Sequence, residues 1–202
     1  EDPIVETSES YGKFYTRYMK IVRRVTQSGN GFGGANTSYS NIPLKQNILY
    51  EMGSFKMICL AANGAIAETP TNVQVAQTGK AKENDLSFGF LIQFRSFQYF
   101  TGGDLGGMVH GGSGTNMESP LVKANYFKGL ISPQNHVCAL KVSHHGSAGS
   151  TNDDFITTIN PTLAVIMGNY RKYNGTPLPT LPNILNQLKK AGLEPGDEIF
   201  LT

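Results

Sequence analysis

The sequence predicts an α/β fold, in which strands and helices form layers, and three observations support this prediction. Short runs rich in branched and aromatic residues, typical of strands, occur along the chain beside segments with helical periodicity. Two helical segments have clear boundary signals: Thr151 or Asn152 precedes the first and Pro161 ends it, whereas Pro182 begins the second and Gly192 follows it. Both kinds of element occur in each half of the chain, as expected for an α/β arrangement.

The first 46 residues are expected to contain a helix and a glycine-rich insertion. After a polar, extended arm at 1–10, apolar residues recur every three or four positions over 11–25, which predicts an amphipathic helix with a solvated basic face. A flexible connector follows at 28–43. Its glycines match a dinucleotide-binding spacing, but a helix precedes them where such a motif needs a strand, so we reject that interpretation.

The rest of the chain, 47–202, is expected to hold most of the strands and helices. Turns are predicted at Asn63-Gly64 and at Arg95-Ser96. The expected elements are, in order, strands at 47–50, 55–61, 86–94 and 98–101, a helix at 121–130, a strand at 136–142, a helix at 153–159, a strand at 163–167, a helix at 182–191 and a strand at 198–201.

Composition restricts the possible functions only in part. The formal net charge is +2, which implies no strong attraction to nucleic acid or to an anionic membrane, so nucleic-acid binding would have to come from a specific site. Cys59 and Cys138 lie in apolar sequence and are expected to be small core residues, not a disulfide or a zinc knuckle. No apolar run is long enough to span a membrane, and the compartment stays open.

Two strand ends carry the residues best suited to chemistry. The run LKVSHHGS places His144 and His145 directly after an expected buried strand, and the run YFTGGDLGG places Asp104 in a glycine-rich turn after another. Carboxylate and imidazole groups at the ends of neighbouring strands suit a divalent metal such as zinc, manganese or iron. Taken locally, the same residues also fit a turn-forming aspartate and two structural histidines.

These runs, in this order, resemble the metallo-β-lactamase superfamily, within it the branch that includes the ComEC competence-protein domain and phosphorylcholine esterase. The resemblance covers about residues 83–202. It rests on the runs ENDLS, FTGGDL and LKVSHHGS, on the following Ser150-Thr151 and DFITTINP, and on LAVIMGN, PNILNQLKKAG and EIFLT. It implies a four-layer αββα fold, of which 1–202 would be a single domain lacking its N-terminal portion.

The resemblance also implies a metal-dependent hydrolase that activates a water, most simply a phosphoesterase or phosphodiesterase with zinc, manganese or iron as one or two ions. Asp104 matches the family's bridging metal ligand, His145 matches a ligand of the first metal, and His144 matches a residue facing a small-molecule or phosphoester substrate. Asp104 and His144 would then be catalytic. Asn84 is expected beside this site, and Lys141 and Ser147 are expected to orient its residues.

Two features depart from the family pattern. The family's H-x-H-x-D-H motif does not occur, and Thr176 stands where the histidine for a second metal is expected. We interpret the chain as the C-terminal portion of the domain, whose partner would be the remaining N-terminal portion carrying the other ligands. The alternatives are a degenerate, non-catalytic binding domain and a ComEC-like nuclease domain. His110 is expected to be a loop residue and His136 a structural one, while Tyr170 and Tyr173 could line a pocket or a surface loop.

Overall fold

The computed structural model describes residues 49–76, 81–108, 114–147, 149–167, 181–195 and 197–201, except for the side chains of 49, 50, 181 and 182. The chain separates into two compact units, Glu1–Pro43 and Leu44–Thr202, and every described residue belongs to the second. The expected helix at 11–25 and the connector at 28–43 therefore lie outside the described residues.

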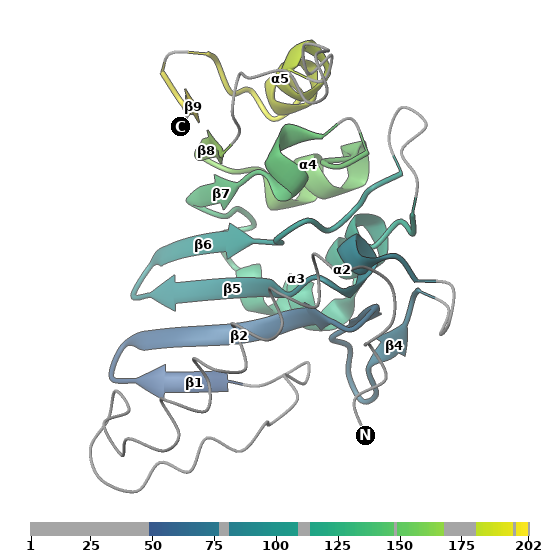
Figure 1. The fold of residues 1–202 in the computed structure, drawn as a ribbon. Coiled ribbons are helices and arrows are strands. Elements are labelled where there is room, and N and C mark those ends of the chain that lie inside the picture. The colour runs from purple at the N-terminus through teal and green to yellow at the C-terminus, as the bar shows by residue number, and fades with distance from the viewer. Residues whose placement is uncertain are drawn as a thin grey trace, which may run out of the picture. The chain divides into compact units, whose positions relative to one another are not determined.

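The described strands form one mixed sheet of nine strands (Figure 1). Its path is β4-β3-β2-β5-β6-β7-β8-β9, and β1 also pairs with β2. Pairing is antiparallel from β1 to β6 and parallel from β6 to β9. The strands are β1 Leu49–Met52, β2 Phe55–Ala62, β3 Ala65–Ile66, β4 Val73–Gln74, β5 Gly89–Phe94, β6 Phe97–Thr101, β7 Ala139–Lys141, β8 Leu163–Ile166 and β9 Ile199–Leu201.

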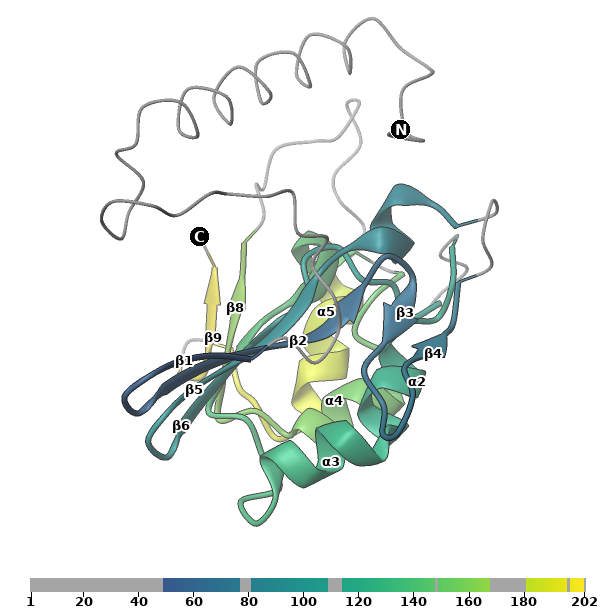
Figure 2. The ribbon, with the colours of Figure 1, turned by 90° about the horizontal axis from the view of Figure 1, so that it is seen from below.

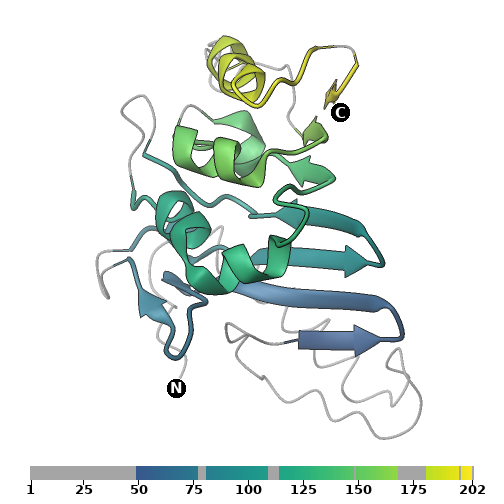
Figure 3. The same ribbon diagram turned by 180° about the vertical axis from the view of Figure 1, so that it is seen from behind.

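Four described α-helices cover one face of this sheet (Figures 2 and 3). They are α2 Glu118–Lys123, α3 Asn125–Ile131, α4 Asp153–Ile159 and α5 Leu181–Lys189. Two short 3₁₀ turns, η1 Glu83–Leu86 and η2 Ser143–Gly146, lie beside strand ends. The predicted α/β class is confirmed. Within the described segments, no helix has the length and hydropathy needed to cross a membrane.

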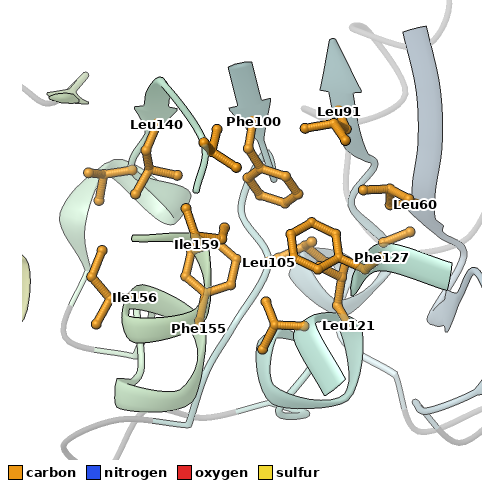
Figure 4. Packing of buried hydrophobic residues seen from close by; sticks show 14 of the residues in the cluster. Leu60, Leu91, Phe100, Leu105, Leu121, Phe127, Leu140, Phe155, Ile156 and Ile159 are labelled. Carbon is orange, nitrogen blue, oxygen red and sulfur yellow. The ribbon is translucent and has the colours of Figure 1, made fainter. Parts of the chain in front are cut away.

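The main core lies between the sheet and these helices. Phe100 of β6 is fully buried, and its ring meets Phe127 of α3 and Phe155 of α4 edge-on, at centroid distances of 6.4 and 5.4 Å (Figure 4). Leu91 and Leu140, on the strands at either side, are also fully buried (Figure 4). Because side chains alternate along a strand, these residues define the helix-covered face and leave their sequence neighbours on the other face.

Most predicted elements are confirmed, with shifts that have local causes. The predicted strand at 86–94 starts only at Gly89, because 83–86 form η1. The predicted helix at 121–130 is two helices, since Ala124 has an extended ψ of 133° that interrupts the helical hydrogen bonds. The predicted helix at 153–159 is confirmed, and the side chain of Asn152, not that of Thr151, caps it by accepting from Phe155 N.

Other boundaries move by a few residues, and two strands were missed. The predicted strand at 136–142 is only Ala139–Lys141, and the helix expected at 182–191 is Leu181–Lys189. The turn at Asn63-Gly64 is confirmed, both residues having positive φ, but the two-residue strands β3 and β4 after it were not predicted. Segments that short carry too little periodicity to detect.

The mixed pairing brings four strand termini to one edge of the sheet. β6, β7 and β8 are parallel and β5 is antiparallel to β6. The start of β5 therefore lies at the same edge as the ends of the other three strands. Asp104 follows β6 and the two histidines follow β7, so the topology places both motifs at this edge.

Candidate metal centre

Asp104 lies in a tight turn directly after β6. Gly102 is buried so closely against Ser143 that an added Cβ would lie 2.8 Å from the serine Oγ, and Gly103 has a φ of +57°. The backbone N–H of Asp104 donates to Ser87 Oγ, at 3.2 Å, just before β5. The glycines therefore allow a turn that an ordinary side chain would obstruct, and Ser87 fixes its end.

The two histidines adopt an unfavourable backbone conformation at the end of β7. His144 has φ 48° and His145 has φ 55°, both in the left-handed region that non-glycine residues rarely adopt. The N–H of His144 donates to the Gly103 carbonyl, at 2.9 Å, which joins this turn to the turn that carries Asp104. Strained residues of this kind cluster at functional sites, because the surrounding structure must hold them there.

His145 and Asp104 face each other across the sheet edge. His145 Nε2 lies 3.5 Å from Asp104 Oδ1, and both side chains are solvent-accessible, at 59% and 38%. The other ring nitrogen, Nδ1, lies 2.7 Å from the Met167 carbonyl after β8 and donates its proton to that oxygen. In the neutral tautomer that this hydrogen bond favours, the Nε2 lone pair is directed toward Asp104.

The His145–Asp104 pair fits two neighbouring ligands of a divalent cation. At ordinary zinc–ligand distances of about 2.0–2.2 Å, two ligands of a tetrahedral site lie roughly 3.4 Å apart. Carboxylate oxygen and imidazole nitrogen are suitable donors for zinc, manganese or iron. Among the residues that the structure describes, no group of three or more His, Cys, Asp or Glu side chains converges, so a metal site here would need further ligands besides this pair.

His144 points to a different partner. Its Nε2 lies 3.2 Å from Asn84 Nδ2 in η1, and the amide N–H donates to the ring nitrogen. The side chain is partly exposed. Asn84 thus lies beside the candidate site, where the sequence analysis expects it, and it orients the ring of His144 next to the Asp104–His145 pair, whose side chains stay accessible to solvent.

Lys141, the last residue of β7, lies beside both motifs. Its Nζ is 3.4 Å from the Gly103 carbonyl and 3.3 Å from the Val142 carbonyl. Burial lowers the pKa of Lys141, and the negative charge of Asp104 opposes that change. Lys141 and Asp104 are therefore close enough to interact electrostatically.

A buried carboxylate that the sequence did not reveal supports the same region. Glu118 is fully buried, and its two oxygens accept from the backbone N–H groups of Thr151 and Asn152, each at 2.8 Å. Gly107 packs against it, in the segment that follows Asp104. Glu118 therefore connects the segment after Asp104 to the segment after His145. Its burial could not be predicted from the sequence, because it is an isolated glutamate in a polar stretch.

The free energy of unfolding should depend on pH through Glu118. Burial raises its pKa from 4.5 to about 8, against the opposing effect of the two N–H donors. The folded state then retains a proton that the unfolded chain releases, so stability should fall as pH rises from 4.5 to about 8. The maximal slope for one group is about 1.4 kcal/mol per pH unit. Denaturant unfolding across this range measures it.

Glu118→Gln should flatten this pH dependence, because glutamine does not titrate. The matched control, Glu51→Gln on β1, changes an exposed glutamate and should keep the wild-type slope. Equal slopes in wild type and Glu118→Gln would contradict a titrating Glu118.

An open hollow of about 510 Å³ lies away from the pair. Its polar groups are largely satisfied: Lys190 pairs with Asp153 at 2.6 Å, and the Asn152 amide donates to Gly107 O and Asn116 Oδ1. Its lining residues are Gly107, Met108, Asn116, Ser119, Asn152, Asp153, Asp154, Gln187 and Lys190. The lining includes neither Asp104 nor His145, so we place the candidate site at the sheet edge.

The remaining predicted residues fall into two groups. His110, Tyr170, Tyr173 and Thr176 lie outside the described residues. His136 is a partly exposed residue before β7 with Nδ1 3.1 Å from the Gln134 carbonyl, and Ser147 Oγ accepts from Gly149 N at 3.3 Å within the loop after the histidines. Both cysteines are free. Cys59 is buried as predicted, and burial raises its pKa to about 11, whereas Cys138 is only partly buried.

Neither the protein-family models nor the curated proteins contain a match to this chain.

Proposed function

We propose that the chain is part of a metal-dependent hydrolase of the metallo-β-lactamase superfamily that acts on phosphoesters. The observation that carries this proposal is the His145–Asp104 pair. Its nitrogen and oxygen are 3.5 Å apart, and the Met167 carbonyl holds the proton of His145 on the nitrogen that faces away from Asp104. Histidine ligands of metals commonly have such a partner on the second ring nitrogen.

The sheet face that none of the described helices covers supports the proposed four-layer αββα fold. In β5–β9 the side chains opposite the four helices are largely apolar and partly exposed, and they include Phe90, Ile92, Tyr99, Leu163, Val165 and Phe200. A sheet face of this composition is expected to pack against another layer. In the proposed fold, that layer is a second sheet, and the edge with Asp104 and His145 borders both sheets.

The residues of this chain would have distinct roles in hydrolysis. Asp104 and His145 would hold the cation, which when bound supplies an electrophile and lowers the pKa of a water. His144, oriented by Asn84 at 3.2 Å, would contact a phosphoryl oxygen of the substrate. The strained backbone of His144 and His145 keeps both rings at the edge in the absence of substrate, which reduces the reorganisation required during the reaction.

A non-catalytic binding domain is the second candidate function. It is favoured by the number of donors, since the described segments bring only this carboxylate and this imidazole together at the edge. A pair of ligands binds a cation weakly unless other groups complete the site. A ComEC-like nuclease stays a prediction from the resemblance, and the modest net charge of +2 does not favour it.

Hydrolysis of a chromogenic phosphodiester with added zinc or manganese tests the enzymatic proposal. We expect the wild type to hydrolyse the phosphodiester, a chelator to abolish this activity, and manganese or zinc to restore it. The Asp104→Asn variant should be inactive. An inactive protein that still binds the metal through Asp104 would favour the binding domain, and a protein that binds no metal would overturn both metal-based functions.

A further inference from the structure

We propose that Lys141 is a positioning residue that holds the turn carrying Asp104 and the strand end carrying the two histidines at their mutual spacing. The importance of that spacing for metal binding rests on the proposed function. The positioning itself rests on contacts of this chain alone, so the two can be tested separately.

Lys141 bridges the two segments that carry the candidate ligands. Its ammonium lies 3.4 Å from the carbonyl of Gly103, the residue before Asp104, and 3.3 Å from the carbonyl of Val142, two residues before His144. The Gly103 carbonyl also accepts from His144 N at 2.9 Å. One carbonyl thus receives two donors from the β7 end, which ties the Asp104 turn to that end.

Lys141 lies at a position in the sheet where a lysine without hydrogen-bond acceptors would be unfavourable. It pairs in register with Thr101 of β6 and Val165 of β8, on the face where most neighbouring side chains are apolar. A lysine that is partly removed from water there is stabilised only if its N–H groups find acceptors. Two of the three ammonium N–H groups can donate to the two carbonyls, and Asp104 supplies a nearby negative charge.

The backbone next to the contacts of Lys141 is strained at the two histidines, which have φ 48° and 55°. Gly103, which has φ +57°, adopts this conformation without strain because it lacks a Cβ. Strained conformations persist only where several contacts fix them. Removing the ammonium should therefore loosen the junction between Gly103 and His144 and broaden the distribution of distances between Asp104 Oδ1 and His145 Nε2.

Lys141→Met, which keeps the length of the side chain and removes its charge and donors, tests this role. In metal-free protein, amide exchange at His144 should accelerate about threefold to tenfold, as expected for one weakened hydrogen bond. Lys141→Arg keeps a cationic donor and should stay near wild type. Lys56→Met, at an exposed lysine on β2 paired with Glu51, is the matched control and should change nothing at His144.

Metal binding provides the second measurement. If the wild type binds zinc, Lys141→Met should reduce its affinity roughly 10–100-fold, as outer-sphere substitutions do, and Lys141→Arg should recover most of it. A wild-type protein that binds no zinc would refute the proposed function. The amide-exchange rate at His144 would still decide whether Lys141 has a positioning role. Unchanged exchange at His144 in Lys141→Met, or unchanged zinc affinity in a protein that binds zinc, would overturn the positioning role.

Discussion

Replacing Asp104 by alanine should weaken zinc or manganese binding by at least about 100-fold, because loss of a ligand exceeds the 10–100-fold effect of losing an outer-sphere partner. The carboxylate supplies the oxygen 3.5 Å from His145 Nε2, and within the described residues no third such group lies close enough to replace it. Because the side chain is 38% exposed, the free energy of unfolding without metal should change by less than about 1 kcal/mol. Equilibrium dialysis with metal analysis measures the affinity.

Asp197→Ala is the matched control for Asp104→Ala, because it removes an exposed aspartate before β9, remote in sequence from the site. It should leave both metal affinity and stability at the wild-type level. Equal metal affinities for wild type and Asp104→Ala would show that the metal binds elsewhere and would contradict the assigned site.

Gly107→Ala should destabilise the protein by about 3 kcal/mol or more, the upper end of the usual cost of overpacking. An added Cβ would collide with the buried Glu118 Oε2 and approach Asn152 Nδ2 to 2.9 Å. Relief would require Glu118 to move and leave the N–H groups of Thr151 and Asn152 without their acceptor. Denaturant unfolding of the metal-free protein measures this effect.

Gly129→Ala, the same substitution at another glycine, should increase the free energy of unfolding instead of decreasing it. Gly129 lies inside α3, and an added Cβ there meets nothing within 4 Å. Alanine should stabilise this helix by roughly 0.5–1 kcal/mol through its higher helix propensity. A destabilisation by Gly107→Ala of no more than about 1 kcal/mol would contradict the close contact between Gly107 and Glu118.

The fold could be predicted from the sequence wherever the signals were local. The residues of α4 repeat with helical spacing, and the Asn63-Gly64 and Arg95-Ser96 turns separate strand-like runs, so these features were correctly predicted. The break at Ala124 and the two-residue strands β3 and β4 were missed, because tertiary contacts decide them and no periodic pattern precedes them.

The candidate site was predictable in part for the same reason. The motifs indicated Asp104, His144 and His145, because polar residues directly follow strand-like runs. The contacts of Met167 O with His145 and of Ser87 Oγ with Asp104 could not be predicted, since they join segments far apart in sequence. The buried position of Glu118 at the start of α2 could not be predicted either, because an isolated glutamate gives no local signal of burial.

Imidazole ¹H–¹⁵N spectra recorded during a zinc titration test whether His145 Nε2 and Asp104 bind one divalent cation. We expect zinc to shift the His145 Nε2 resonance while Nδ1 keeps the proton donated to Met167 O, and we expect Asp104→Ala to weaken this response. His144 should remain bonded to Asn84 through Nε2. His145 resonances that do not respond to zinc, or a response unchanged in Asp104→Ala, would contradict the account.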